Sequence, residues 1–129
     1  MRVLVTGASG FLGGRTARLL LGEHGVVGTG GVFPPARRRA LEEAGVRLRT
    51  ADLTAPDSLG PLLEDVDAVV HCAALSTLWG RRDQLQRINV DASARLARAS
   101  AERGLRLVHI SSPSIYNRAV HEDPRWGTP

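Results

Sequence analysis

The sequence predicts an α/β fold, namely a Rossmann-type, doubly wound parallel sheet with strand order 3-2-1-4-5. Short apolar segments alternate with helical segments along most of the chain. The apolar segments are nearly continuous rather than alternating, which is typical of parallel strands covered on both faces. A glycine-rich turn also joins the first strand to the first helix. With right-handed crossovers, ligands bind such a sheet at the carboxyl ends of its strands, where the strand order reverses.

The first half of the chain supplies two strands and two helices. Arg2–Thr6 is rich in Val and Leu and ends at a glycine, which predicts a buried strand. Phe11–Leu21 is predicted to be a helix, and Gly25–Thr29 is predicted to be the second strand. Pro34-Pro35 opens a further helix that ends near Gly45, since proline favours the first helical turn.

The second half continues the same alternation. Val46–Thr50 is the third predicted strand, followed by a helix from Pro56 to about Leu63. Asp67–Ala73 is the fourth strand, and Asp83–Arg103 is the longest helix, followed by a glycine in the position of a C-cap. Leu105–Ser111 is the fifth strand and the last element, because the proline-containing residues 112–129 indicate a loop.

Length and composition favour one cofactor-binding domain over residues 1–129. The 129 residues suit a single domain, and 43% hydrophobic with 23% charged residues is ordinary globular composition. No segment approaches the ~20 apolar residues of a membrane span, so we expect no membrane association. The single Cys72 predicts a reducing, cytoplasmic environment. The four histidines lack metal-ligand spacing, so no metal site is expected. His71 and His109 lie within predicted strands and are expected in the core rather than in catalysis.

The net charge of +4 and the isoelectric point near 10.9 raise the question of nucleic-acid binding. All 17 basic residues are arginines, and most of them are scattered. Aromatic residues, which stack on bases, make up only 4%. We therefore interpret the charge as a generally basic surface and expect no nucleic-acid partner.

The turn after the first strand contains Gly7, Gly10 and Gly13 in the spacing G-x-x-G-x-x-G. Bare backbone at such a turn lets a pyrophosphate approach the N-terminus of the following helix, whose N–H groups are free. Glycine also serves ordinary turns, but here the triplet follows a strand and opens a helix. No Gly-Lys-Ser/Thr follows, which excludes a P-loop. The turn predicts dinucleotide binding.

Further motifs follow in order along the chain. These are Thr6-Gly7-x-x-Gly10-Phe11-Leu12-Gly13, Asp52-Leu53, His71-Cys72-Ala73-Ala74, Asn89-Val90 and Ser111-Ser112-Pro113-Ser114-Ile115-Tyr116. Together they resemble the extended short-chain dehydrogenases/reductases, the family of NAD-dependent epimerases and dehydratases, over residues 1 to about 124. The segments 73–80 and 112–115 are most similar to its 3β-hydroxysteroid-dehydrogenase-like branch.

The resemblance implies an NAD(P)-dependent oxidoreductase or epimerase that moves a hydride to or from a carbonyl or hydroxyl carbon. It implies cofactor contacts at Gly7, Ser9, Gly10, Phe11, Leu12, Gly13, Asp52, Leu53, Ala73 and Ala74. Asp52 is expected to contact the adenine amino group, although an Asp at this position also fits a simple turn. Ala73 and Ala74 are expected to leave room for a ribose, or else serve only packing.

The same resemblance implies three residues near the reaction. Ser112, four residues before Tyr116, is expected to hydrogen-bond the reacting carbonyl or hydroxyl group. In the long helix an apolar stripe at three- and four-residue spacing predicts the buried face: Leu85, Ile88, Ala92, Leu96 and Ala99. Asn89 borders this face and is expected to order the active site, while a locally satisfied helix-edge Asn is the alternative. Tyr116 is expected on the substrate side, but Asn117 follows it where the family usually has glycine.

The choice between NAD and NADP depends on the segment after the second strand. No acidic residue, which would hold the ribose hydroxyls of NAD, occurs between Glu23 and Glu42. Arg37 and the two arginines after it could instead meet a 2′-phosphate. The sequence therefore favours NADP over NAD, although these arginines could also form a solvated helix face.

The family's chemistry needs a Tyr-x-x-x-Lys pair, in which the Lys lowers the pKa of the Tyr. Tyr116 is the only tyrosine, Val120 stands four residues later, and the sequence has no lysine. We therefore expect the chain by itself to be inactive and to be the N-terminal part of a longer enzyme. Only that full-length enzyme would bind a small-molecule substrate. The alternative is a non-catalytic dinucleotide-binding module.

The fifth strand would be an open edge of the sheet. An unpaired edge predicts a homodimer or another association through that edge.

Overall fold

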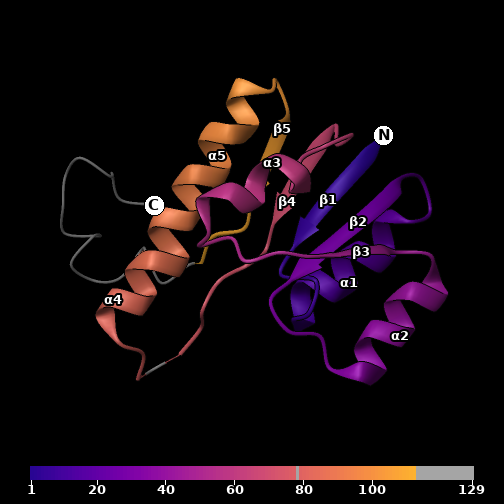
Figure 1. Ribbon diagram of the computed structural model, residues 1–129. Helices are drawn as coiled ribbons and strands as arrows, with labels where there is room; N and C mark the ends of the chain where they lie inside the picture. The colour runs from indigo at the N-terminus through magenta and orange to yellow at the C-terminus, as the bar shows by residue number, and fades with distance from the viewer. Residues whose placement is uncertain (78, 113–129) are drawn as a thin grey trace, which may run out of the picture.

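The computed structural model describes residues 1–77 and 79–112, and it shows a five-stranded parallel sheet between two layers of helices (Figure 1). The strands are β1 Arg2–Thr6, β2 Gly25–Gly30, β3 Arg47–Thr50, β4 Ala68–His71 and β5 Arg106–His109. Their order is β3-β2-β1-β4-β5, and every neighbouring pair is parallel. The predicted fold class and strand order are confirmed.

The helices cover both faces of this sheet. They are α1 Phe11–Leu20, α2 Pro35–Ala44, α3 Leu59–Leu62, α4 Arg82–Leu85 and α5 Ala92–Glu102. On one face, α3 and α5 bury Leu62 and Leu96 against Leu4 of β1. On the other, α1 and α2 bury Ala17 and Leu41 against the alternate strand positions. Because both faces are covered, the central strands β1 and β4 carry apolar residues at consecutive positions, whereas the edge strand β3 places Leu48 between Arg47 and Arg49.

Four predicted elements differ from the structure, one of them the strand expected over Leu105–Ser111, which is Arg106–His109. The helix expected over 56–63 is a 3₁₀ turn, Pro56–Ser58, followed by the single turn of α3. The strand expected over Asp67–Ala73 ends at His71, where its pairing with Thr6 of β1 also ends. The helix expected over Asp83–Arg103 contains a π-helical segment, Gln86–Asp91, between α4 and α5.

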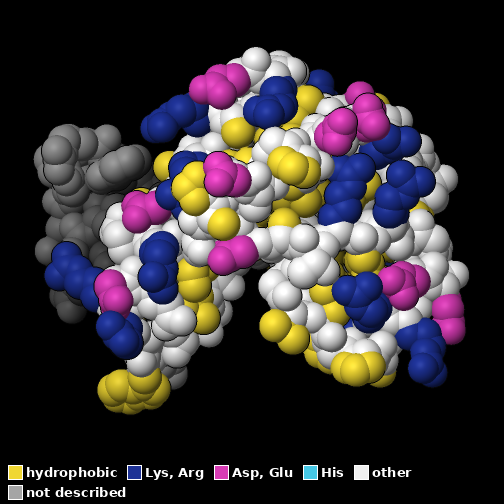
Figure 2. Space-filling view, in the orientation of Figure 1, with side chains coloured by type: hydrophobic (Ala, Val, Ile, Leu, Met, Phe, Trp, Pro, Cys, Tyr) yellow, Lys and Arg dark blue, Asp and Glu magenta, His cyan; other side chains and the backbone are white. Residues whose placement is uncertain are grey.

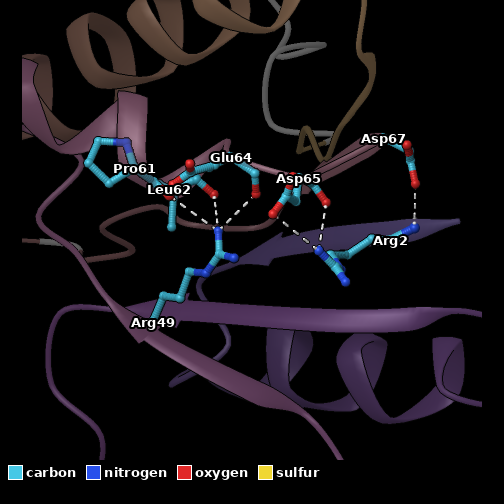
Figure 3. Close-up of polar contacts among 7 residues, drawn as sticks. All are labelled: Arg2, Arg49, Pro61, Leu62, Glu64, Asp65 and Asp67. Carbon is cyan, nitrogen blue, oxygen red and sulfur yellow. Dashed lines mark hydrogen bonds and ion pairs between the residues drawn. The ribbon is translucent and has the colours of Figure 1, made fainter.

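Two arginines hold the connection between α3 and β4 (Figure 3). Arg49 of β3 donates from Nη1 to the carbonyl oxygens of Pro61, Leu62 and Glu64 at 3.1–3.2 Å, and so caps the end of α3. Arg2 donates through its backbone N–H to Asp67 Oδ2 at 2.6 Å and through its guanidinium to the Asp65 carbonyl at 3.3 Å. These contacts set where β4 begins beside β1.

Strand β5 lies at the edge of the sheet, where it pairs with β4 alone among the described residues. Val108 and Ile110 are 47% and 41% exposed. His109, expected in the core from its place in an apolar strand, is also exposed, because the edge strand has a neighbour on one side only.

Candidate functional site

The glycine turn between β1 and α1 has the backbone that close approach requires. Gly7 has φ +69°, a left-handed conformation that favours glycine, and a Cβ there would lie 2.8 Å from Ala73 N. A Cβ on Gly13 would overlap the carbonyl oxygen of Gly7. Gly10 differs, because its φ of −89° suits any residue and a Cβ would meet only Gly7 O, at 3.3 Å. Gly7 and Gly13 thus shape the turn, while Gly10 leaves its outer side bare.

A cavity of about 500 Å³ opens at the carboxyl ends of the strands, directly over this turn. Figure 2 shows the molecule hollowed at this edge, between the part that carries α4 and α5 and the part that carries α1 and α2. Ten residues predicted to bind a cofactor line the cavity: Gly7, Ser9, Gly10, Phe11, Leu12, Gly13, Asp52, Leu53, Ala73 and Ala74. Its volume is within the range of ligand sites, ~300–1,000 Å³.

Asp52 lies in a tight turn at one end of the cavity. Its Oδ1 accepts hydrogen bonds from Thr54 N at 2.9 Å and Thr54 Oγ1 at 2.6 Å. These two bonds lower the pKa of Asp52 below its usual value, with smaller contributions from Arg87 and Arg95. Asp52 can therefore stabilise a turn and also contact a cofactor, because one carboxylate oxygen bonds within the turn and the residue also lines the cavity.

The end of β4 is held by a polar network beneath the cavity. Thr6 Oγ1 accepts from the backbone N–H groups of Cys72 and Ala73, each at 3.1 Å, and lies 2.7 Å from His71 Nδ1. Because both acceptor positions of that hydroxyl are taken, its hydrogen points to His71 Nδ1. His71 Nε2 then carries the ring hydrogen and donates to Ser93 Oγ at 2.8 Å.

His71 is 2% exposed, so this network encloses an uncharged imidazole. Burial lowers the pKa of His71 to about 4, and the neighbouring His109 ring, 5.4 Å away between centroids, adds to the effect. Sequence reasoning treated His71 as a core residue and missed its two partners. The contact between Thr6 and His71 could have been predicted from the strand order, since these residues end adjacent strands opposite each other.

Asn89 lies in the π-helical segment and holds the chain beyond β4. Its Oδ1 accepts from Leu75 N at 2.7 Å, and its Nδ2 donates to Leu75 O at 2.9 Å. This double contact joins Asn89 to a segment 14 residues away, so it is not a local helix-edge contact. Asn89 itself does not line the cavity, whereas its neighbour Ile88 does.

Arg37 lies beside the glycine turn and not within the main cavity. Its Nη1 donates to Ser9 O at 2.7 Å, and it lines a smaller cavity of about 210 Å³ that shares Gly10 and Phe11 with the first. Arg38 is engaged elsewhere, with Glu42 at 3.1 Å and over the ring of Phe33. Of the two, Arg37 is the one that faces the glycine turn.

The predicted reaction residues are only partly described. Ser112 follows β5 and is exposed, and Tyr116 lies outside the described residues. Cys72 lines the cavity, and burial raises the pKa of its thiol, with an opposing hydrogen bond to Thr16. Within residues 1–77 and 79–112, no cluster of three metal-ligating side chains occurs and no helix is long and apolar enough to cross a membrane.

A parallel sheet of order 3-2-1-4-5 with a glycine turn and cavity at the strand ends defines the class of Rossmann-type dinucleotide-binding domains. Residues 3–127 match the model of the NAD dependent epimerase/dehydratase family. The chain belongs to this family, as the resemblance of its motifs predicted.

Individual relatives agree with this assignment. The 2-alkyl-3-oxoalkanoate reductase of Stenotrophomonas maltophilia is 34% identical over 94% of the chain. The UDP-glucuronic acid 4-epimerase of Bacillus cereus, solved in complex with NAD, superimposes with a TM-score of 0.78 at 31% identity over 92% of the chain. A short-chain dehydrogenase/reductase superfamily protein of Agrobacterium tumefaciens with bound NAD gives 0.77 at 26% identity over 91%. The chain spans 36%, 42% and 34% of these three proteins.

Proposed function

We propose that this chain is the cofactor-binding part of an NAD(P)-dependent oxidoreductase or epimerase of the extended short-chain type. The observation that carries the proposal is the glycine turn, in which Gly7 and Gly13 leave no room for a side chain and Gly10 leaves the outer side bare, at the start of α1, whose first N–H groups receive no side-chain cap. That arrangement suits a pyrophosphate. Two structural relatives contain NAD.

The described residues divide the work of holding a dinucleotide. The glycine turn and the start of α1 bind the pyrophosphate, and Asp52 accepts a hydrogen bond from the adenine amino group. The small Ala73 and Ala74 leave space for the nicotinamide ribose, and Asn89 holds the segment that follows them. A bound nicotinamide would supply the hydride acceptor or donor. Ser112 and Tyr116 are assigned to the substrate side.

The substitution Gly10→Val tests the pyrophosphate site without damaging the turn. Its backbone conformation suits valine, so the fold should persist while the new side chain occupies the position of the phosphates. Titration calorimetry with NAD and NADP should detect binding to the parent and none to the variant. The matched control is Gly60→Val, since Gly60 has no atom within 4 Å of its would-be Cβ and does not line the cavity. Equal affinity for Gly10→Val and the parent would overturn the proposal.

We further propose a preference for NADP. The position that would carry an acid at the end of β2 is Gly30, whose Cβ would meet Ser9 Oγ at 2.5 Å, and Arg37 binds the carbonyl of the same Ser9. A charge-assisted pair with a 2′-phosphate contributes about 1.5–3 kcal/mol, or roughly 10- to 150-fold in affinity. Arg37→Ala should remove this preference and Arg39→Ala, exposed on the same helix, should keep it. Tighter binding of NAD by the parent would refute it.

For the whole protein we propose hydride transfer at a carbonyl or hydroxyl carbon, in the 3β-hydroxysteroid-dehydrogenase-like branch. The similarity to a 2-alkyl-3-oxoalkanoate reductase supports a ketone substrate. The alternative is a dinucleotide-binding module without turnover. Sequencing the gene beyond codon 129 separates the two. A downstream Tyr-x-x-x-Lys pair supports the enzyme, and a stop codon at that point supports the module.

A further inference from the structure

The turn 52–54 is tied down on both sides, although it lies at the rim of the cavity. Besides the two bonds from Thr54 to Asp52 Oδ1, the Asp52 carbonyl accepts from Ser58 Oγ at 2.6 Å and from Ala55 N at 3.0 Å. Within the described part of the chain, Asp52 Oδ2 accepts no hydrogen bond. The turn therefore keeps one carboxylate oxygen available for a donor outside it.

Arg95 reaches this turn from the other side of the cavity. It lies on α5, one turn after the cavity-lining Ala92, and its Nη2 donates to Thr54 O at 2.9 Å. The two residues are 41 positions apart in the sequence, so this contact joins separate elements. Arg95 Nε is buried and has no hydrogen-bond partner among the described residues. Burying an unpaired guanidinium N–H costs free energy, so a solvated arginine would be more favourable if stability alone mattered.

The position of Arg95 also affects the charge of the turn. Arg95 and Arg87 both help to keep the pKa of Asp52 low, after the larger effect of the Thr54 hydrogen bonds. An ionised carboxylate is purely an acceptor and selects a donor such as an amino group over a carbonyl oxygen.

We propose that Arg95 is a positioning residue for base recognition, which clamps the 52–54 turn to α5 so that Asp52 selects a 6-aminopurine. This inference rests on the proposed dinucleotide function. It assigns to α5 a direct effect on the base end of the cavity, in addition to the packing of its apolar face.

The test compares NAD with nicotinamide hypoxanthine dinucleotide, in which a carbonyl oxygen replaces the 6-amino group. The parent chain should bind NAD about tenfold more tightly, as expected for one hydrogen bond to a charged group. Arg95→Met should lose most of this preference for NAD, chiefly because it binds NAD more weakly. Arg95→Lys, which keeps the charge and a donor, should retain part of it. Arg98→Met, at an exposed position on the same helix, should leave it unchanged.

The outcomes separate this inference from the proposed function. If the parent binds neither dinucleotide, the proposed function fails and this inference fails with it. If the parent prefers NAD and Arg95→Met weakens both dinucleotides equally, Arg95 only stabilises the fold and the inference alone is overturned. Should Arg95→Met not fold, Arg95→Lys decides the question by the same ratio. Asp52→Asn and Arg95→Lys form a double-mutant cycle. If Arg95 acts through Asp52, adding Arg95→Lys to Asp52→Asn should cause no further loss of the preference for NAD.

Discussion

Acidification should destabilise the folded chain through His71 well before the carboxylates are protonated. In the fold the His71 ring accepts a hydrogen at Nδ1 from Thr6 and donates one from Nε2 to Ser93, which requires the neutral ring. A second proton would place Nδ1–H against a hydroxyl whose acceptor positions are filled by Cys72 and Ala73. Protonation therefore opposes the folded state.

The size of the effect follows from the pKa difference between the two states. Burial lowers the pKa of His71 from 6.5 to about 4 in the fold. The unfolded chain takes up this proton as the pH falls below 6.5, and the folded chain resists until about pH 4. The stabilisation is complete above 6.5, decreases as the pH falls from 6.5 through 4, and amounts to about 3 kcal/mol in all, at 1.36 kcal/mol per pKa unit. Between pH 7.5 and 5 the loss is about 2 kcal/mol.

Urea unfolding followed by circular dichroism between pH 7.5 and 5, without ligand, measures this loss. Carboxylates stay mostly ionised above pH 5, so the interval reports mainly on histidine. His71→Gln should be less stable at pH 7.5 but nearly independent of pH. His109→Gln removes only the smaller electrostatic contribution and should keep most of the slope. A parent chain equally stable at pH 7.5 and 5, or a His71→Gln chain with the parent's slope, would refute the reasoning.

Three further predictions concern the rest of the chain. Arg49→Met should lower the free energy of unfolding by about 1–3 kcal/mol, because three carbonyls at the end of α3 lose their donor, while the exposed Arg47→Met should not. The chain should self-associate through the edge of β5, and Val108→Lys should shift it to monomer in sedimentation equilibrium. A parent that remains monomeric at high concentration would contradict this. The 129-residue chain alone should oxidise no NADPH with carbonyl compounds, and a measurable rate would count against the assigned chemistry.

The sheet was predictable because most strands are short apolar runs and most crossovers contain a recognisable helix, with β3 and the crossover at 56–62 as the exceptions. The family resemblance supplied ten cofactor candidates, and these residues line one cavity because the ends of parallel strands meet at one edge. The errors in the predicted strands have physical causes. β4 ends at the same pair, Thr6 and His71, as its neighbour β1, and His109 is exposed because an edge strand has a neighbour on one side only.

Other features depend on contacts between distant residues and give no local signal. The segment Gln86–Asp91 contains neither Gly nor Pro, yet it is π-helical. A π turn changes the direction of side chains before it relative to those after it. The predicted apolar stripe is accordingly buried at Ala92 and Leu96 but only half-buried at Leu85 and Ile88. The contact from Arg95 to Thr54 spans 41 residues and could be found only from the fold.

The glycine turn and the polar contacts of β4 form one arrangement. Because Gly7 turns β1 away at the site, the backbone beyond His71 loses the neighbour that would continue its ladder of hydrogen bonds. Thr6 Oγ1 takes the N–H groups of Cys72 and Ala73, and the Asn89 side chain takes both polar groups of Leu75. Side chains thus form the hydrogen bonds to this backbone that a neighbouring strand would otherwise form. This leaves Ala73 and Ala74 along the cavity wall, next to Gly7, whose missing side chain lets Ala73 lie so close.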